Sequence, residues 1–260
     1  MRAQVMALVV SGSLALALGA CGGGGPKTRD ESNPPQSATP PRSKGCEDLP
    51  KAAELKKFLQ DAPSQNGDAG GLNHGKAMWG ALVNRDGELC ALAVSTEDMA
   101  ATWPGSRQIA IAKAFTANAF SSDTSPLSTA RVYTLSQPGH SLWSIANGNP
   151  FNPQCMGAAN DTKTGIGKVC GGTIAFGGGL ALYKGQTRVG GLGVSGDTSC
   201  ADHEIAKRVR QSAGLAPTGL PSDDILYSSV DGPSPFVHPL CANTYRDGRK
   251  VGDEPASSGY

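Results

Sequence analysis

The chain has 260 residues, with 23 lysines and arginines against 22 aspartates and glutamates. A net charge this close to zero argues against nucleic acid, or a polybasic membrane-binding surface, as the main mode of recognition. Glycine is abundant at 35 residues, whereas aromatic residues make up only 5% of the chain. This composition favours tight turns and close backbone contacts over a large aromatic core.

The N-terminus has the features of an export signal. Arg2 is followed by an apolar stretch from Val5 to Ala20, which is too short to span a bilayer comfortably, since that takes about 20 apolar residues. The stretch ends in Leu-Gly-Ala-Cys at 18–21, which resembles a lipobox. We therefore expect cleavage after Ala20, lipid on Cys21, and anchoring in the cell envelope facing the periplasm or the exterior. The alternative is an ordinary secretory signal with a chance cysteine.

Composition divides the rest of the chain into three parts. Residues 21–45 combine the expected lipid site with a Gly- and Pro-rich segment that has almost no apolar residues, so we expect a disordered tether. Residues 46–216 are long enough for one domain with its own core. Residues 217–260 are rich in Pro, Ser and Gly and are predicted to form a C-terminal tail.

The first predicted elements are a helix, a hairpin and a second helix. Apolar residues at helical spacing predict a helix over Glu47–Leu59. Met78–Asn84 and Leu89–Ser95 are predicted strands, joined by a tight turn at Arg85–Glu88 in which Asp-Gly tolerates positive φ. Ser106 begins a predicted helix that ends near Phe120, and its many alanines would let another backbone approach closely.

Further helices and strands are predicted after this point. They are helical patches from Leu127 and around Ser141–Ala146, a strand over Gly172–Phe176, a hairpin of Leu180–Tyr183 with Thr187–Ser195, and a helix over Ala201–Ala213. This order predicts an α/β (α+β) fold with a mainly antiparallel sheet and helices packed on it.

Seven cysteines are present, and setting aside Cys21 leaves an even six. In an oxidising compartment such a set suggests disulfides, although the sequence cannot choose among the possible pairings. We favour Cys155 with Cys170 because they bracket a polar loop. No C-x-x-C pair is present, so we expect no metal site. The candidate disulfide cysteines are Cys46, Cys90, Cys155, Cys170, Cys200 and Cys241.

The segment Gly191–Gly196 matches G-x-G-x-x-G, follows a predicted strand and precedes a helix. The strand is the second arm of a hairpin and no parallel crossover follows, so close packing of glycines is the favoured interpretation. A second interpretation stays open, in which backbone N–H groups at Gly193, Ser195 and Gly196 hold an anion such as a carboxylate. Ser195 lacks the G-x-S-x-G context of a nucleophile elbow.

Cys200 and His203 are three residues apart, as a metal-binding pair on a helix would be. Because no second pair has matching spacing, a capped helix start with Asp202 near its N-terminal dipole is the favoured interpretation.

Several motifs in this order resemble the GlcG/HbpS family of haem-binding and haem-degrading-like proteins, over roughly Met78 to Ala213. The most specific are Lys-Ala-Phe-Thr-Ala at 113–117 and Val-Gly-Gly-Leu-Gly-Val-Ser-Gly at 189–196. The others are ALVNRDGELCALAVS, SRQIAIAKAFTANAF, Ser-Pro-Leu-Ser-Thr at 125–129, FGGGLALYKGQTRVGGLGVSG, and Asp202 followed by Ile205-Ala206. An insertion at about Asn147–Cys170 departs from the family pattern.

The resemblance implies a profilin-like α/β/α sandwich with a five-stranded antiparallel sheet, and self-association into a homo-oligomer through helices. It also implies haem as a possible cofactor. The candidate threonine ligands are Thr116 and Thr124, although Thr116 could equally bond back to a preceding carbonyl within its helix. Lys113 could meet a haem carboxylate, and His74 and His140 are further candidate ligands because both lie in predicted loops.

These observations predict an extracytoplasmic lipoprotein that binds haem, a related tetrapyrrole or another small molecule as a binder or sensor, with no nucleic-acid partner. Two alternatives stay open: an oligomeric accessory lipoprotein without ligand, and a slow haem-degrading enzyme. No base-and-nucleophile pair stands out, so we expect no catalytic residues. The candidate pocket walls are Met78, Trp79, Phe115, Phe120, Tyr133 and Trp143.

Overall fold

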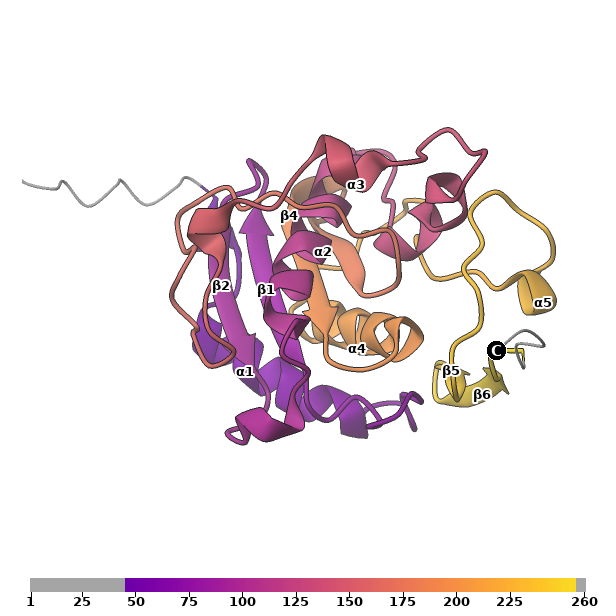
Figure 1. Ribbon diagram of the computed structural model, residues 1–260, viewed down its shortest axis with the longest axis horizontal. Coiled ribbons are helices and arrows are strands. Elements are labelled where there is room, and N and C mark those ends of the chain that lie inside the picture. The colour runs from indigo at the N-terminus through magenta and orange to yellow at the C-terminus, as the bar shows by residue number, and fades with distance from the viewer. Residues whose placement is uncertain (1–44, 256–260) are drawn as a thin grey trace, which may run out of the picture. The chain divides into compact units, whose positions relative to one another are not determined.

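The computed structural model describes residues 45–255, so the predicted signal peptide, Cys21 and nearly all of the predicted tether lie outside the described residues. The main sheet has four antiparallel strands in the order β2-β1-β4-β3 (Figure 1). Their bounds are β1 Trp79–Asn84, β2 Leu89–Val94, β3 Gly179–Lys184 and β4 Thr187–Ser195. Both predicted hairpins are therefore present, and β1 and β4 are the central strands that join them.

Helices cover both faces of this sheet. Helix α2 (Ser106–Phe120) packs on one face, and α1 (Ala52–Asp61) and α4 (Ser199–Ser212) pack on the other (Figure 1). Alternation along β1 serves both cores, since Leu82 points toward α1 and α4 whereas Ala81 and Val83 point toward α2. The predicted α/β class, with an antiparallel sheet between helices, is confirmed.

The sheet differs from expectation in having four strands rather than five among the described residues. The segment Gly172–Phe176 forms no strand, because side chains take up its backbone groups: Thr116 Oγ1 accepts from Ile174 N at 3.0 Å, and Asn149 Nδ2 donates to Gly172 O at 2.9 Å. Gly171 and Gly172 also have positive φ values, of 65° and 82°, which are incompatible with an extended strand.

Two glycines of β4 explain how α2 lies so close to the sheet. A Cβ atom on Gly193 would fall 1.9 Å from Ala110 O, and one on Gly191 would fall 2.2 Å from Ala114 O. The helix backbone therefore occupies the space that side chains at these positions would need. Ala110 and Ala114 are fully buried in this contact, so these alanines pack inside the molecule, and not on a free face for self-association.

The predicted tail has more structure than its composition suggested. Within residues 213–255 lie helix α5 (Ser228–Asp231) and a second, two-stranded sheet of β5 (Thr244–Arg246) and β6 (Arg249–Gly252). A bridge between Gly70 and Thr244 and a disulfide between Cys200 and Cys241 tie this part to the domain.

The remaining helices are short. They are α3 (Ile145–Gly148) and 3₁₀ turns at Cys46–Asp48, Ala62–Ser64, Met99–Ala101, Thr129–Val132, Thr134–Ser136 and Pro153–Cys155. None of the helices between residues 45 and 255 combines the length and apolar character needed to cross a membrane.

The six cysteines form three disulfides, Cys46–Cys90, Cys155–Cys170 and Cys200–Cys241, with Cα–Cα distances of 5.4, 5.7 and 6.0 Å. The pairing favoured from the sequence, Cys155 with Cys170, is one of them. It closes the insertion that follows α3 and packs against the core on the α2 side of the sheet.

Candidate functional site

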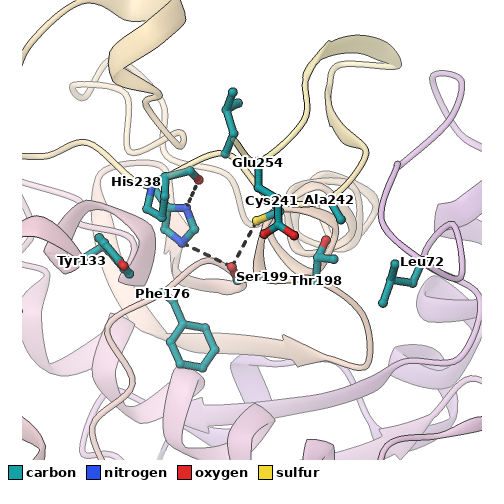
Figure 2. A pocket seen from close by; sticks show the side chains of 11 residues that line it. Leu72, Tyr133, Phe176, Thr198, Ser199, His238, Cys241, Ala242 and Glu254 are labelled. Atoms are coloured by element: carbon teal, nitrogen blue, oxygen red, sulfur yellow. Dashed lines mark hydrogen bonds between the residues drawn. The ribbon is translucent and has the colours of Figure 1, made fainter. Parts of the chain in front are cut away.

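An open cavity of about 540 Å³ lies at the start of α4. Its position is set by the β4–α4 connection on one side and by the segment 238–242 on the other (Figure 2). Most of its surface is apolar. The lining residues are Leu72, Tyr133, Phe176, Thr198, Ser199, His238, Pro239, Leu240, Cys241, Ala242 and Glu254.

His238 is the histidine that lines this cavity. Its backbone is fixed because His238 N donates to Leu226 O at 2.7 Å, and its ring lies 5.0 Å from the Tyr133 ring, between centroids. Nδ1 is 2.7 Å from Pro239 O. A carbonyl oxygen only accepts, so Nδ1 carries the proton and Nε2 keeps its lone pair.

The surroundings of Nε2 keep this imidazole neutral. Gly177 N donates to Nε2 at 3.3 Å, and Ser199 Oγ lies 3.3 Å away. Burial lowers the pKa of His238 to about 4, against 6.5 for an ordinary histidine. At neutral pH the cavity therefore offers an uncharged nitrogen that can act as a ligand or as an acceptor.

The N-terminus of α4 forms the other side of the cavity. Thr198 caps the helix by accepting from Ala201 N. Ser199 Oγ lies 3.4 Å from Cys241 Sγ, and Cys200 N donates to the same sulfur at 3.2 Å. The Cys200–Cys241 disulfide thus joins the helix start to the segment that carries His238. Figure 2 shows Ser199, His238 and Cys241 close together at this junction.

A buried ion pair lies beneath this region. Lys113 Nζ, from the middle of α2, is 2.6 Å from Asp202 Oδ2 and also donates to Val194 O at 3.0 Å. Both side chains are almost completely buried. Burial raises the pKa of Asp202 to about 6 and lowers that of Lys113. The Lys113 ammonium is also 5.0 Å from the ring centroid of Phe176, a cavity residue.

The loop proposed to hold an anion does hold one, but the anion belongs to the chain itself. Asp202 Oδ1 accepts from Gly196 N at 3.0 Å and from Asp197 N at 2.9 Å. Gly193 instead faces the backbone of α2, and Ser195 pairs with Trp79 in the sheet. Neither Lys113 nor Gly196 is therefore available to a ligand carboxylate in this conformation.

The two candidate threonines lie away from the cavity. Thr116 is buried, and its Oγ1 donates to Ala112 O at 2.7 Å while accepting from Ile174 N, so the hydroxyl is occupied by backbone groups as the alternative interpretation expected. Thr124 is exposed, in a turn where its backbone N–H donates to Ser122 Oγ. A smaller cavity of about 230 Å³ does lie beside α2, lined in part by Ala112 and Ile174.

The two candidate histidines are exposed and lie outside both cavities. His74 Nδ1 pairs with Asp68 Oδ1 at 2.9 Å, and its side chain is 51% exposed. His140 is exposed in the loop before α3. The structure thus brings together neither the histidines nor the threonines selected from the sequence.

The predicted pocket walls are divided in the same way. Tyr133 lines the larger cavity, whereas Met78 and Trp79 are buried in the two opposite cores. Trp143 is 59% exposed. Of the six predicted wall residues, only Tyr133 is among those that line the larger cavity.

His203 does not share a site with Cys200. Its Nε2 lies 3.2 Å from Asp224 Oδ1, and it is buried on α4. The histidine beside Cys200 is His238, whose Nδ1 lies 4.0 Å from Cys200 Sγ.

A family model described as "Haem degrading protein HbpS-like" matches residues 69–211, which is more than half of the chain. The chain belongs to the HbpS-like family. The match begins before β1 and ends within α4, so it contains both hairpins, α2 and the Lys113–Asp202 pair. No curated protein matches the chain.

Several solved structures resemble this chain at low sequence identity. A PduOC:heme complex is 19% identical, with a TM-score of 0.44, and the match covers 64% of this chain and 94% of that chain. The Klebsiella pneumoniae protein ORFY is 18% identical with a TM-score of 0.44, covering 73% and 99% respectively. A double mutant of Streptomyces reticuli HbpS is 18% identical with a TM-score of 0.41, covering 72% and 98%.

One wall of the larger cavity lies outside the region matched by the HbpS-like family. Phe176 and Ser199 fall within the match, whereas His238, Cys241 and Glu254 come after it. Sequence reasoning missed His238 because its place beside α4 depends on a long-range disulfide. The signal that could have found it is its position three residues before Cys241.

Proposed function

We propose that this protein binds haem, or a related flat tetrapyrrole, in the cavity between Phe176 and His238, and acts as a binder or sensor. Membership of a family described as haem degrading makes haem the natural first ligand to test. The cavity volume of about 540 Å³ falls in the range of about 300–1,000 Å³ that is usual for small-molecule sites. Its apolar lining, with Tyr133 and Phe176, suits a flat aromatic ring system.

The observation that carries this proposal is the neutral imidazole of His238. In many metal-ligating histidines one ring nitrogen donates to a carbonyl while the other keeps its lone pair for the metal. His238 has this tautomer, with Nδ1 donating to Pro239 O and an unprotonated Nε2 that accepts from Gly177 N at 3.3 Å, a contact that the iron would replace. His238 would hold the haem through Nε2, and the bound haem would supply a redox-active iron. Phe176 and Tyr133 would exclude water from the ring.

A haem titration followed by visible absorbance tests this function. We expect saturation at one haem per chain, and loss of the ligand-field signature in His238→Ala. His74→Ala and His140→Ala are matched controls, because they remove exposed imidazoles that do not line the cavity. A response that does not saturate, or that is equal in all four proteins, would contradict the proposal. Stable absorbance in the presence of a reductant and catalase would favour binding over turnover.

We propose further that the chain acts outside the cytoplasm as a lipoprotein, with lipid on Cys21. The support is the lipobox-like sequence at 18–21 together with three disulfides, which persist in oxidising compartments. Labelling of cells with a fatty-acid analogue should mark the wild-type chain and not Cys21→Ala. Equal labelling of both, or of neither, would oppose this localisation.

A further inference from the structure

Three side chains at the edge of the larger cavity have the chemistry of a metal site. The sulfur atoms of Cys200 and Cys241 and a ring nitrogen of His238 all lie within 4.8 Å of one another, and all three residues are buried. Between residues 45 and 255, this is the one cluster of three or more His, Cys, Asp or Glu residues with such spacing. In the structure the two sulfurs are joined as a disulfide.

We propose that reduction of the Cys200–Cys241 disulfide creates a site for one thiolate- and imidazole-binding metal ion of the Zn²⁺ class. Two thiolates and one imidazole are a common ligand set for Zn²⁺, whose fourth position is taken by a water or another side chain. Cys241 and His238 both line the cavity, so this fourth position is open to a ligand there. The disulfide and the metal site are thus two states of the same three residues.

The start of α4 favours the thiolate state of this cluster. Cys200 N donates to Cys241 Sγ at 3.2 Å, and Ser199 Oγ lies 3.4 Å from it. Donors of this kind at a helix N-terminus stabilise a thiolate. Because these groups surround the sulfur in the disulfide state already, the loss of the S–S bond leaves a site that needs little rearrangement of the backbone.

His238 has a ring orientation that allows a metal to bind at Nδ1. Nδ1 lies 4.0 Å from Cys200 Sγ. With a metal on Nδ1 in place of its proton, the contacts of Nδ1 with Pro239 O and of Gly177 N with Nε2 are given up. The proton would move to Nε2, where Ser199 Oγ lies 3.3 Å away as an acceptor. This outer hydrogen bond is the usual way in which a metal-bound histidine is held in one tautomer.

The redox step needs a dithiol reductant. The dithiol transfers two electrons and two protons, so that the S–S bond of Cys200–Cys241 breaks and both sulfurs become thiols, while the dithiol closes to its own disulfide. Binding of the metal ion then releases two protons from these thiols and one from the imidazole Nδ1, and Nε2 takes one up. Cys241 is the sulfur that faces the cavity and is therefore the one that the reductant reaches first.

Cobalt(II) is the probe for this site, because thiolate ligands give it charge-transfer absorption that Zn²⁺ lacks. The full-length protein is reduced with a dithiol, freed of reductant without oxygen, and titrated with Co²⁺ and then Zn²⁺. Thiol alkylation and mass spectrometry determine which disulfides have opened. We expect one Co²⁺ per chain with thiolate charge transfer, displacement by Zn²⁺, and no binding before reduction.

Variants assign the ligands. We expect Co²⁺ binding to weaken in each of three single variants: Cys241→Ser, Cys200→Ser and His238→Gln. Loss of only the hydrogen-bond partner of a metal ligand typically costs about 10- to 100-fold in metal affinity, so loss of a ligand itself should cost more. The double variant Cys155→Ser/Cys170→Ser is the matched control, since it removes two cysteines from a pair that has no histidine in its cluster. Circular dichroism checks the fold of each, and Cys200→Ser replaces Cys241→Ser if the latter unfolds.

Three results would overturn the proposal: unchanged Co²⁺ affinity in the cysteine variants, no binding after the disulfide has opened, or a disulfide that does not open in the folded protein. None of these results bears on haem, which is titrated into the oxidised protein. Conversely, failure of the oxidised protein to bind haem would leave the metal site standing.

Discussion

The buried charges of Lys113 and Asp202 stabilise the fold only as a pair. Lys113 and Asp202 lie in different helices and satisfy one another in a region that water does not reach. Asp202 also accepts two backbone N–H groups, so each of its oxygens is occupied. Breaking such a pair leaves an uncompensated charge, which costs more than the intact pair contributes.

We therefore expect Asp202→Asn to lower the free energy of unfolding by about 3–5 kcal/mol, the usual cost of breaking a buried pair. Asn keeps an oxygen for Gly196 N but leaves the Lys113 ammonium without a counter-charge. Denaturant unfolding measures the change. The double variant Lys113→Met/Asp202→Asn should recover most of the loss, and Asp61→Asn, in an exposed pair with Lys57, should change stability far less. A small effect of Asp202→Asn would show that Lys113 is not charged in the folded protein.

His238 should make the disulfide-bonded protein sensitive to acid. Its folded-state pKa of about 4 lies below the ordinary 6.5, so the unfolded chain binds more protons between these values. Stability is then present above pH 6.5 and is lost as the pH falls toward 4, by roughly 3 kcal/mol at about 1.4 kcal/mol per pKa unit.

Unfolding free energies measured across this pH range provide the check. In His238→Gln the free energy of unfolding lost between pH 6.5 and pH 4 should be smaller by this amount. His140→Gln replaces an exposed imidazole and should lose as much stability as the wild type. Parallel curves for wild type and His238→Gln would mean that the ring is charged, or accessible, in the folded state.

At the scale of elements, the contact between α2 and β4 determines the layer arrangement. The sequence pattern predicted both hairpins and α2 because alternation, the Asp-Gly turn and the alanine stripe are local signals. Residues distant in sequence decide the rest: Thr116 and Asn149 satisfy the backbone of Gly172–Phe176 and replace a fifth strand with an irregular segment. Thr198 caps α4 and begins it at Ser199, two residues before the predicted start.

The contact between β4 and α2 predicts a large effect of a single methyl group. Gly193→Ala would place Cβ 1.9 Å from Ala110 O, so the helix must move away from the sheet. Overpacking typically costs about 1–3 kcal/mol, and we expect the free energy of unfolding to fall by at least this much. Thermal or denaturant unfolding measures the change. Gly148→Ala is the matched control, since its added Cβ meets nothing within 4 Å. Equal stability of the two variants would contradict the packing described.

At the scale of the whole molecule, the described C-terminal residues complete a cavity that the family-matched region builds only in part. The position of His238 could not be predicted from periodicity, because Cys200 and Cys241 are 41 positions apart in the sequence and the residues after α4 contain no periodic pattern that fixes their path. The disulfide between Cys200 and Cys241 places this segment beside α4. The candidate site was therefore less predictable than the fold, which depends mainly on local patterns.

Removal of this cross-link should loosen one wall of the cavity. For Cys200→Ala/Cys241→Ala we expect a loss of about 2–4 kcal/mol, the usual contribution of a disulfide, and faster hydrogen exchange in residues 238–254. Exchange in β1 and β4 should change little, since those strands are central in the sheet. Uniform acceleration across the whole domain would instead mean that the cross-link stabilises the global fold and not this wall.

The carboxylate of Asp202, seated on the N–H groups of Gly196 and Asp197, has a consequence for specificity. Because it is tethered only a few residues away, it acts as a built-in competitor at an effective concentration of about millimolar or above, and Lys113 holds it in place. A phosphate from solution would have to displace this internal anion and leave two charges unpaired. The segment Gly191–Gly196 matches the dinucleotide motif, but the Asp202 carboxylate occupies the N–H groups that a nucleotide phosphate would need. The cavity beside this segment has a mainly apolar lining.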